Sequence, residues 1–112
     1  MSFGELFTDF QNQVVSNAGV LAKDTLKDLV AIAEDDAKEF LVSSEEKLKR
    51  WTEMLADERL TKLEFAALVD SQKGLAVLNG LAHAGIAAAT VQRFRDGLID
   101  IVLNAAFKTF LP

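Results

Sequence analysis

The stretch GLAVLNGLAHAGIAAATV, from Gly74 to Val91, decides the fold because it runs eighteen residues without Asp, Glu, Lys or Arg in a chain that is 26% charged. Such a segment is either the buried part of a helical assembly or a segment that enters a lipid bilayer. A membrane-spanning helix needs about 20 predominantly apolar residues. This stretch is rich in alanine rather than leucine and contains Asn79, His83 and three glycines. We therefore expect it to lie in the core of a helical bundle.

Gly85 predicts a turn inside this stretch. It follows His83 and Ala84, and glycine is the residue that most readily takes the left-handed conformation just past a helix end. We therefore expect one helix over residues 61–84 and the next over residues 86–110, joined by a tight turn. His83 is expected to have a structural role, because a protonated imidazole near a helix end faces the negative pole of the helix dipole favourably.

The composition is that of a single all-helical domain over residues 1–112. Ala, Leu, Glu, Lys and Asp dominate, proline occurs only at Pro112, and no alternation of apolar and polar residues indicates a strand. A chain of this length buries about two-thirds of the surface that its unfolded form exposes, which is enough for a core. We expect an all-α antiparallel helical bundle with one long helix, a C-terminal helical hairpin and a short amphipathic N-terminal helix.

The N-terminal segment, residues 1–16, has the pattern of an amphipathic helix. Ser2 and Glu5 have the spacing of a capping box, in which each side chain accepts a hydrogen bond from a free backbone N–H of the first turn. Apolar residues then recur at intervals of three and four, which places them on one helix face. That face covers the core, touches a membrane or, as we predict, forms the interface with a partner. Its residues are Phe3, Leu6, Phe7, Phe10 and Val14.

A second helix is predicted over residues 20–56. Residues 16–19 include Asn and Gly, which favour turns, so the first helix is expected to kink or break there. From residue 20 the apolar positions resume at helical spacing. Ser43 and Glu46 again have capping-box spacing, so the segment forms either one long helix or two helices that divide near Val42.

A cluster of acidic residues lies within this helix, at Glu34, Asp35, Asp36 and Glu39. Carboxylates on adjacent helix positions point in diverging directions and cannot converge as a rigid oxygen cage around a cation. We therefore expect this cluster to lie on a solvated face and to bind no metal.

A short motif after this helix resembles the second half of an EF-hand calcium loop and the start of its exit helix, through Asp57, Leu60, Thr61, Glu64 and Phe65. With Glu64 as the last ligand, Leu55 occupies the third loop position and Glu58 stands where the loop has its glycine. Leucine cannot ligate calcium, so no metal site is expected. The simpler interpretation is a turn over residues 56–60, followed by a helix capped by Thr61 with Glu64.

The charge and residue inventory exclude several functions. The net charge is −5 with a pI near 4.8, whereas nucleic-acid binding requires a clustered basic face, so no nucleic-acid partner is expected. The same charge weakens adsorption to anionic lipids. The chain has one histidine, no cysteine, no phosphate-binding glycine loop and no nucleophile elbow, so we expect no enzyme activity and no cofactor. Residues 1–15 show no secretory signal, so a cytoplasmic location is expected.

The surplus of apolar face leads to the functional prediction. The first, third and fourth helices carry more apolar surface than a monomeric core consumes, and such a surplus implies a partner. We predict a self-associating interaction or scaffold protein, most simply a homodimer, because symmetric pairs are the commonest oligomers. A different protein partner is not distinguished from self-association by the sequence. The alternative is a reversible lipid binder that opens its third and fourth helices onto a bilayer.

Overall fold

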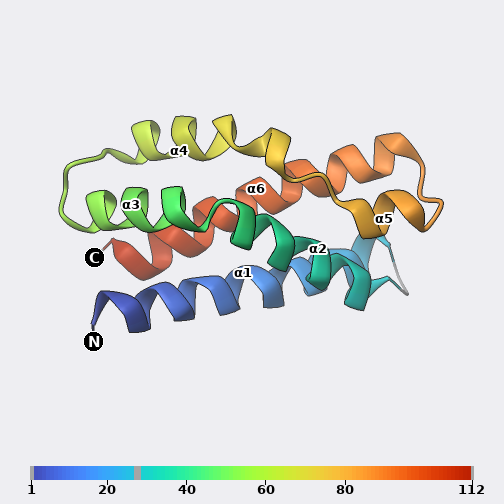
Figure 1. The fold of residues 1–112 in the computed structure, drawn as a ribbon, viewed down its shortest axis with the longest axis horizontal. Helices are drawn as coiled ribbons and strands as arrows, with labels where there is room; N and C mark the ends of the chain where they lie inside the picture. Colours follow the sequence, from blue (N-terminus) through green and yellow to red (C-terminus); the bar gives the residue numbers. More distant parts are fainter. Residues whose placement is uncertain (1, 27–28, 112) are drawn as a thin grey trace.

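The protein is all-helical, as its composition predicts. The computed structural model describes residues 2–26 and 29–111, which form six α-helices and one 3-10 helix (Figure 1). Their bounds are α1 Phe3–Thr25, α2 Val30–Ser43, α3 Glu45–Ala56, α4 Lys62–Ser71, η1 Lys73–Leu75, α5 Asn79–His83 and α6 Ala88–Phe110.

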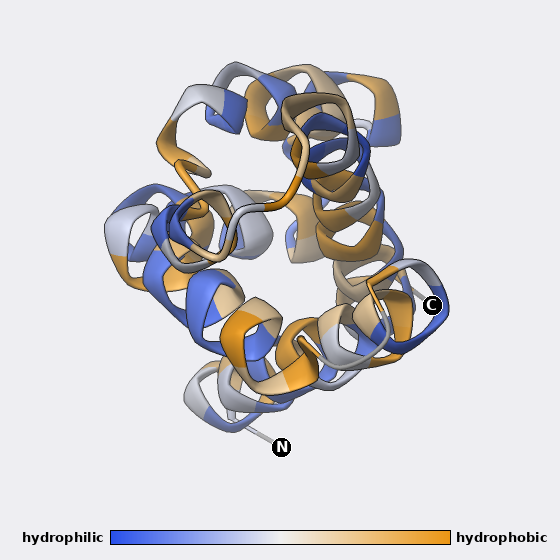
Figure 2. Cartoon of the chain, turned by 90° about the vertical axis from the view of Figure 1, so that its right-hand side faces the viewer, coloured by the Kyte–Doolittle hydropathy of each residue, from blue (hydrophilic) through white to orange (hydrophobic). Residues whose placement is uncertain are grey.

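The helices form an antiparallel bundle that measures 42 × 25 × 21 Å. α1 runs the length of the molecule, α2 and α3 return end to end, α4, η1 and α5 run outward again, and α6 returns (Figure 1). α6 contacts α1, α3, α4 and α5. Figure 2 looks along the bundle from the end that carries α5, with hydrophobic and hydrophilic segments alternating along the helices, as amphipathic helices around a common core require.

The predicted break at residues 16–19 is wrong, because α1 continues through it to Thr25. The Ser2 half of the predicted capping box is confirmed, because its Oγ accepts a hydrogen bond from the Glu5 backbone N–H at 3.2 Å. The Glu5 carboxylate accepts from the Ser2 hydroxyl at 3.1 Å and not from a backbone N–H. Gly19 is buried, and a Cβ built there would lie 3.1 Å from the side chain of Glu34 on α2. The glycine therefore serves close packing of two helices rather than a turn.

The single long helix over residues 20–56 is also wrong, and the alternative of two helices is confirmed. Residues 20–25 belong to α1, and α2 begins only at Val30. α2 and α3 then divide at Ser44, whose side chain makes no capping hydrogen bond to α3. The start of α3 is therefore not the capping box predicted at Ser43 and Glu46, because Ser44 occupies the N-cap position.

The helix predicted over residues 61–84 is shorter than expected. Its start is confirmed, since Thr61 and Glu64 form the reciprocal capping box. α4 ends at Ser71, however, and the chain continues through η1 to Leu78, whose φ of 55° is left-handed. Only α5 follows before Gly85, whose φ of 79° confirms the predicted turn.

The uncharged stretch is therefore only partly in the core. Ala76, Leu78, Leu81 and Val91 are buried, whereas much of the rest of residues 74–91 is exposed to solvent. The centre of the bundle is filled instead by large side chains from every long segment, which are fully buried: Phe10, Phe40, Phe65, Phe94, Leu48, Leu55, Leu81 and Leu98. In the described part of the chain, no helix has the length and apolar character needed to cross a bilayer.

One acidic residue departs from the predicted solvated face. Asp36 is only 4% exposed, and its carboxylate accepts hydrogen bonds from the backbone N–H groups of Gly80 and Leu81, both at 2.9 Å. These N–H groups belong to the first turn of α5, which has no side-chain cap of its own. A carboxylate on α2 thus caps a helix 44 residues further along the chain.

Gly80 allows this close approach of α5 to α2, and its replacement by alanine is expected to destabilise the fold. A Cβ at Gly80 would lie 2.7 Å from Ile32 Cγ2 and 2.9 Å from an Asp36 oxygen that is already hydrogen-bonded. We expect Gly80→Ala to lower the free energy of unfolding by about 1–3 kcal/mol, measured by urea denaturation.

The matched control is Gly74→Ala. No atom outside the neighbouring residues lies within 4 Å of a Cβ at Gly74, so this variant should keep wild-type stability or gain slightly. Equal losses in the two variants would show that backbone freedom, rather than the contact with α2, explains the glycine at position 80.

Candidate functional site

The predicted interface face of α1 is largely occupied within the protomer. Phe7, Phe10 and Val14 are 3%, 0% and 0% exposed, and Phe3 and Leu6 are half-buried against the same core. The premise that these residues exceed what one protomer can bury is therefore wrong for the three buried ones.

The physical reason is the C-terminal end of α6. The Phe110 ring contacts the rings of Phe3 and Phe10, with centroids 5.7 and 5.9 Å apart. The sequence pattern showed a loaded apolar face, but it could not show that the last turn of the chain returns to cover it. Exchanging Phe3, Phe7 and Phe10 together for serine would therefore open the core rather than test an interface.

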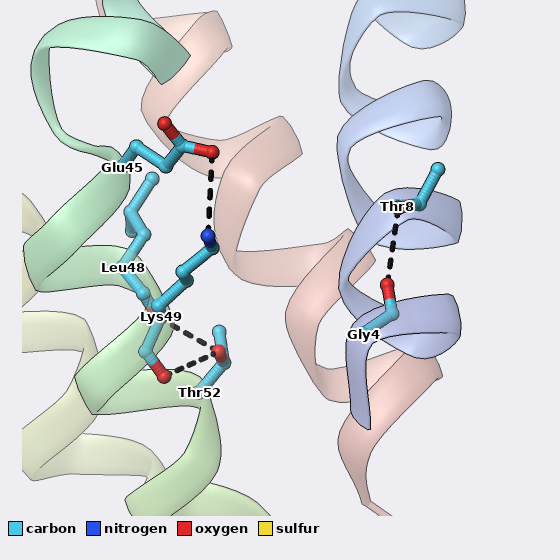
Figure 3. Close-up of polar contacts among 6 residues, drawn as sticks. All are labelled: Gly4, Thr8, Glu45, Leu48, Lys49 and Thr52. Carbon is cyan, nitrogen blue, oxygen red and sulfur yellow. Dashed lines mark hydrogen bonds and ion pairs between the residues drawn. The ribbon is translucent and has the colours of Figure 1, made fainter. Parts of the chain in front are cut away.

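Polar side chains of α3 lie near the outer rim of this face. Figure 3 shows Glu45 and Lys49 on α3, and Gly4 and Thr8 on α1. Lys49 Nζ lies 5.7 Å from the centroid of the Phe7 ring, a cation–π arrangement, and forms an ion pair with Glu45 at 3.6 Å. On α1, the Thr8 hydroxyl donates to the Gly4 carbonyl at 3.0 Å. These contacts close this end of the bundle only in part, because a pocket of about 400 Å³ remains between α1 and α3; its lining is Phe3, Gly4, Phe7, Thr8, Gln11, Glu45 and Lys49.

A different apolar surface is exposed at the opposite end, where the uncharged stretch lies. A groove of about 350 Å³ is formed between the segment that carries α5 and the first turns of α6. Val77, in its wall, is 55% exposed. We call this the α5–α6 groove; its lining is Val77, Ala82, Ile86, Ala88, Val91, Gln92 and Arg95.

Arg95 gives the groove a fixed cationic wall. Its Nε donates to the Ala76 carbonyl and its Nη1 to Gln92 Oε1, both at 2.7 Å. These bonds hold the guanidinium between the extended segment before α5 and the second turn of α6. An immobilised guanidinium loses little further entropy when it binds a carboxylate, so it is suited to recognise one.

A second ion pair connects η1 to α6 beside this wall. Lys73 and Asp96 form a salt bridge, and the hydrogen bond between them raises the pKa of the Lys73 ammonium and lowers the pKa of the Asp96 carboxyl. Both groups therefore keep their charges across the neutral range. The pair ties the start of the exposed segment to α6.

Arg95 is the one charged side chain among the residues that line the groove. Of the other cations nearby in the sequence, Lys73 is paired with Asp96, and Arg93 lines a different pocket together with Leu21 and Thr25. The lack of charge in residues 74–91 was visible in the sequence, but it was interpreted there as a sign of burial.

The polar groups that line the groove are the Gln92 amide and the Arg95 guanidinium. Within residues 2–26 and 29–111, no cluster of three or more His, Asp or Glu side chains is placed to hold a metal ion. His83, the single histidine, is exposed, and its Nδ1 lies 2.7 Å from the Asn79 carbonyl oxygen of its own helix. The groove presents aliphatic walls, one amide and one guanidinium, a combination that accommodates an apolar side chain with a carboxylate nearby.

The position of α5, and hence the groove, depends on the cap that Asp36 provides. We expect Asp36→Asn to lower the free energy of unfolding by about 1–3 kcal/mol, because the amide can accept from only one of the two N–H groups and turns a donor toward the other. Thermal denaturation followed by circular dichroism measures the loss. Asp35→Asn, one residue away and exposed, is the control and should leave the transition unchanged.

Known proteins supply no assignment for this groove. No protein-family model, characterised protein or solved structure matches the chain.

Proposed function

We propose that this protein is a non-enzymatic interaction or scaffold protein that self-associates through the α5–α6 groove, with the cytoplasm as its location. The observation that carries the proposal is the groove itself: an aliphatic depression with an exposed Val77 and with Arg95 held in its wall by two hydrogen bonds. A concave apolar surface with a few polar groups at fixed positions is typical of binding sites. The groove takes the place of the α1 face as the proposed interface.

The residue types in the groove favour a protein partner. Ala82 and Ala88 are exposed and small, so the backbone of a partner helix can approach α5 and α6 closely. The large aromatic side chains that anchor proteins in the lipid interface are not among the lining residues. A protein surface with one protruding apolar side chain fits this lining better than a lipid surface does.

Sedimentation velocity over a range of concentrations tests self-association. We expect the wild-type chain to sediment faster as its concentration rises, and Ala88→Glu to raise the dissociation constant by at least about tenfold because it places a carboxylate in the apolar groove. Glutamate in the first turn of α6 faces the positive helix end, so the fold should be retained.

Val42→Glu is the matched control, since Val42 is 73% exposed on α2, outside the groove. It should associate as the wild type does. A wild-type mass that stays at 12.2 kDa at every concentration would contradict the proposal.

Reversible lipid binding is the second candidate, favoured by Arg93 and Arg95, which follow the uncharged stretch of residues 74–91. Opening the C-terminal helices onto a bilayer would remove Phe94, Leu98 and Val102 of α6 from the core, which is a large cost. Lipid binding through the intact groove surface avoids that cost.

Co-sedimentation with vesicles of phosphatidylglycerol and phosphatidylcholine at pH 5 and pH 7 distinguishes the two candidates. We expect the protein to remain in the supernatant at both pH values, because its overall charge is negative and the groove has few large apolar side chains. Pelleting that Ala88→Glu abolishes would instead favour the lipid candidate.

A further inference from the structure

The segment that joins α4 to α6, residues 72–87, is held differently from the rest of the bundle, and we call it the strap. Its regular structure is limited to η1 and the five-residue α5, and neither has a side-chain cap of its own. Isolated helices of this length are not stable in water. The strap therefore depends on its contacts with α2 and α6 (Figure 1).

The strap buries little apolar surface. Its buried apolar residues are Ala76, Leu78 and Leu81, and most of its other residues are exposed to solvent. Segments with few buried apolar contacts open at a lower free energy than the core helices of the same protein. Apolar packing alone therefore does not hold the strap as firmly as it holds α1 or α6.

Two features inside the strap make its closed form less favourable. Leu78 has a left-handed backbone with φ of 55°, a conformation that is unfavourable for residues other than glycine. Gln72, at the end of α4, is buried, and its Oε1 has no hydrogen-bond partner within residues 2–26 and 29–111. A buried acceptor without a donor is also unfavourable. Opening of the strap relieves both.

Two polar ties from different helices oppose this opening. The Asp36 carboxylate of α2 accepts the backbone N–H groups of Gly80 and Leu81, both at 2.9 Å. The Arg95 guanidinium of α6 donates to the Ala76 carbonyl at 2.7 Å. The ties lie on the two sides of Leu78, so together they hold the strained residue in place.

We infer that the strap opens and closes as one unit while the long helices stay packed, and that its closure regulates the α5–α6 groove. Val77, Ala82 and Ile86 of the strap line the groove opposite the residues of α6, so the groove exists only in the closed form. A partner in the groove therefore stabilises the closed strap, and apparent affinity falls with the fraction of open molecules. This regulation rests on the proposed function, whereas the opening is a property of the single chain.

Hydrogen exchange of backbone amides tests the opening, followed by NMR in urea below the unfolding transition and at a concentration where the chain is monomeric. The amides of Ala76, Ala82 and Ala84 are informative, because each donates to a carbonyl inside the strap and none contacts Asp36 or Arg95. We expect a lower free energy of exchange than for the Leu98 amide of α6, with little dependence on urea, because the opening exposes little surface.

Removal of one tie tests whether the strap is a single unit. Asp36→Asn should speed exchange of the Ala76 amide about tenfold, and Arg95→Gln should do the same for the Ala82 amide, although each amide is remote from the altered tie. The matched controls, Asp35→Asn and Arg93→Gln, change exposed neighbours and should leave both amides unchanged.

A core variant provides the opposite control. Val14 is fully buried on α1, and Val14→Ala should speed exchange of the amides that open only by global unfolding. It should leave the strap amides unchanged, because the open and closed forms of the strap lose the same core contact.

The outcomes separate the opening from the proposed function. The inference is overturned if the strap amides match the Leu98 amide in free energy and urea dependence, or if each tie variant affects only the amides beside it. Raising the wild-type concentration until the chain associates should slow strap exchange about tenfold; association with unchanged strap exchange overturns the regulation and leaves the proposed function standing. A chain that never associates contradicts the proposed function and the regulation together, while exchange in the monomer still decides the opening.

Discussion

The fold depends on a buried carboxylate that replaces a missing helix cap. Asp36 accepts the first N–H groups of α5 and thereby fixes the segment after α4 on the surface of α2. Without this acceptor, those N–H groups would be left unsatisfied beside the core, at a cost of about 1–3 kcal/mol each. The two hydrogen bonds to Asp36 hold α5, a segment of low helix propensity, against α2. The exposed residues on either side of α5 are therefore held in a fixed geometry.

Two contacts fix the shape of the groove: the Asp36 cap holds α5, and Arg95 connects the segment before α5 to α6. The guanidinium is bonded to the Ala76 carbonyl before α5 and to Gln92 on α6, so it connects the two walls that Val77 and Ala88 help to form. Apolar walls with a positioned cation are a binding surface whose shape exists before any partner arrives. Preformed surfaces lose little entropy on association, which favours binding.

The sequence predicted the fold class, the caps at Ser2 and Thr61, and the turn at Gly85. These features are local, because each depends on residues within one helical turn. The breaks after Thr25 and at Ser44 were missed or left open because no glycine or proline marks them. Gly19 was misinterpreted as a break because a helix contact and a turn both call for glycine, and only the position of α2 distinguishes them.

The candidate site could not be predicted from the sequence, because it depends on contacts between residues that are far apart in the chain. Phenylalanine spacing identified an apolar face on α1, but the return of Phe110 to cover it is a contact across almost the whole chain. The groove belongs to the stretch that was expected to be buried. An uncharged run in an acidic protein fits both a buried segment and an exposed apolar surface. The two are distinguished only when the topology is known, and here the run contains both buried and exposed residues.

The backbone conformation and the burial of Leu78 together limit which residues can occupy this position. Its left-handed backbone would suit glycine, yet its side chain is 2% exposed and belongs to the core. Valine and isoleucine would fill the space but are excluded by the positive φ, since a β-branched side chain clashes in that conformation. In a saturation library this position should therefore accept only a narrow group of unbranched or γ-branched apolar residues, an unusual restriction for a site in a connecting loop.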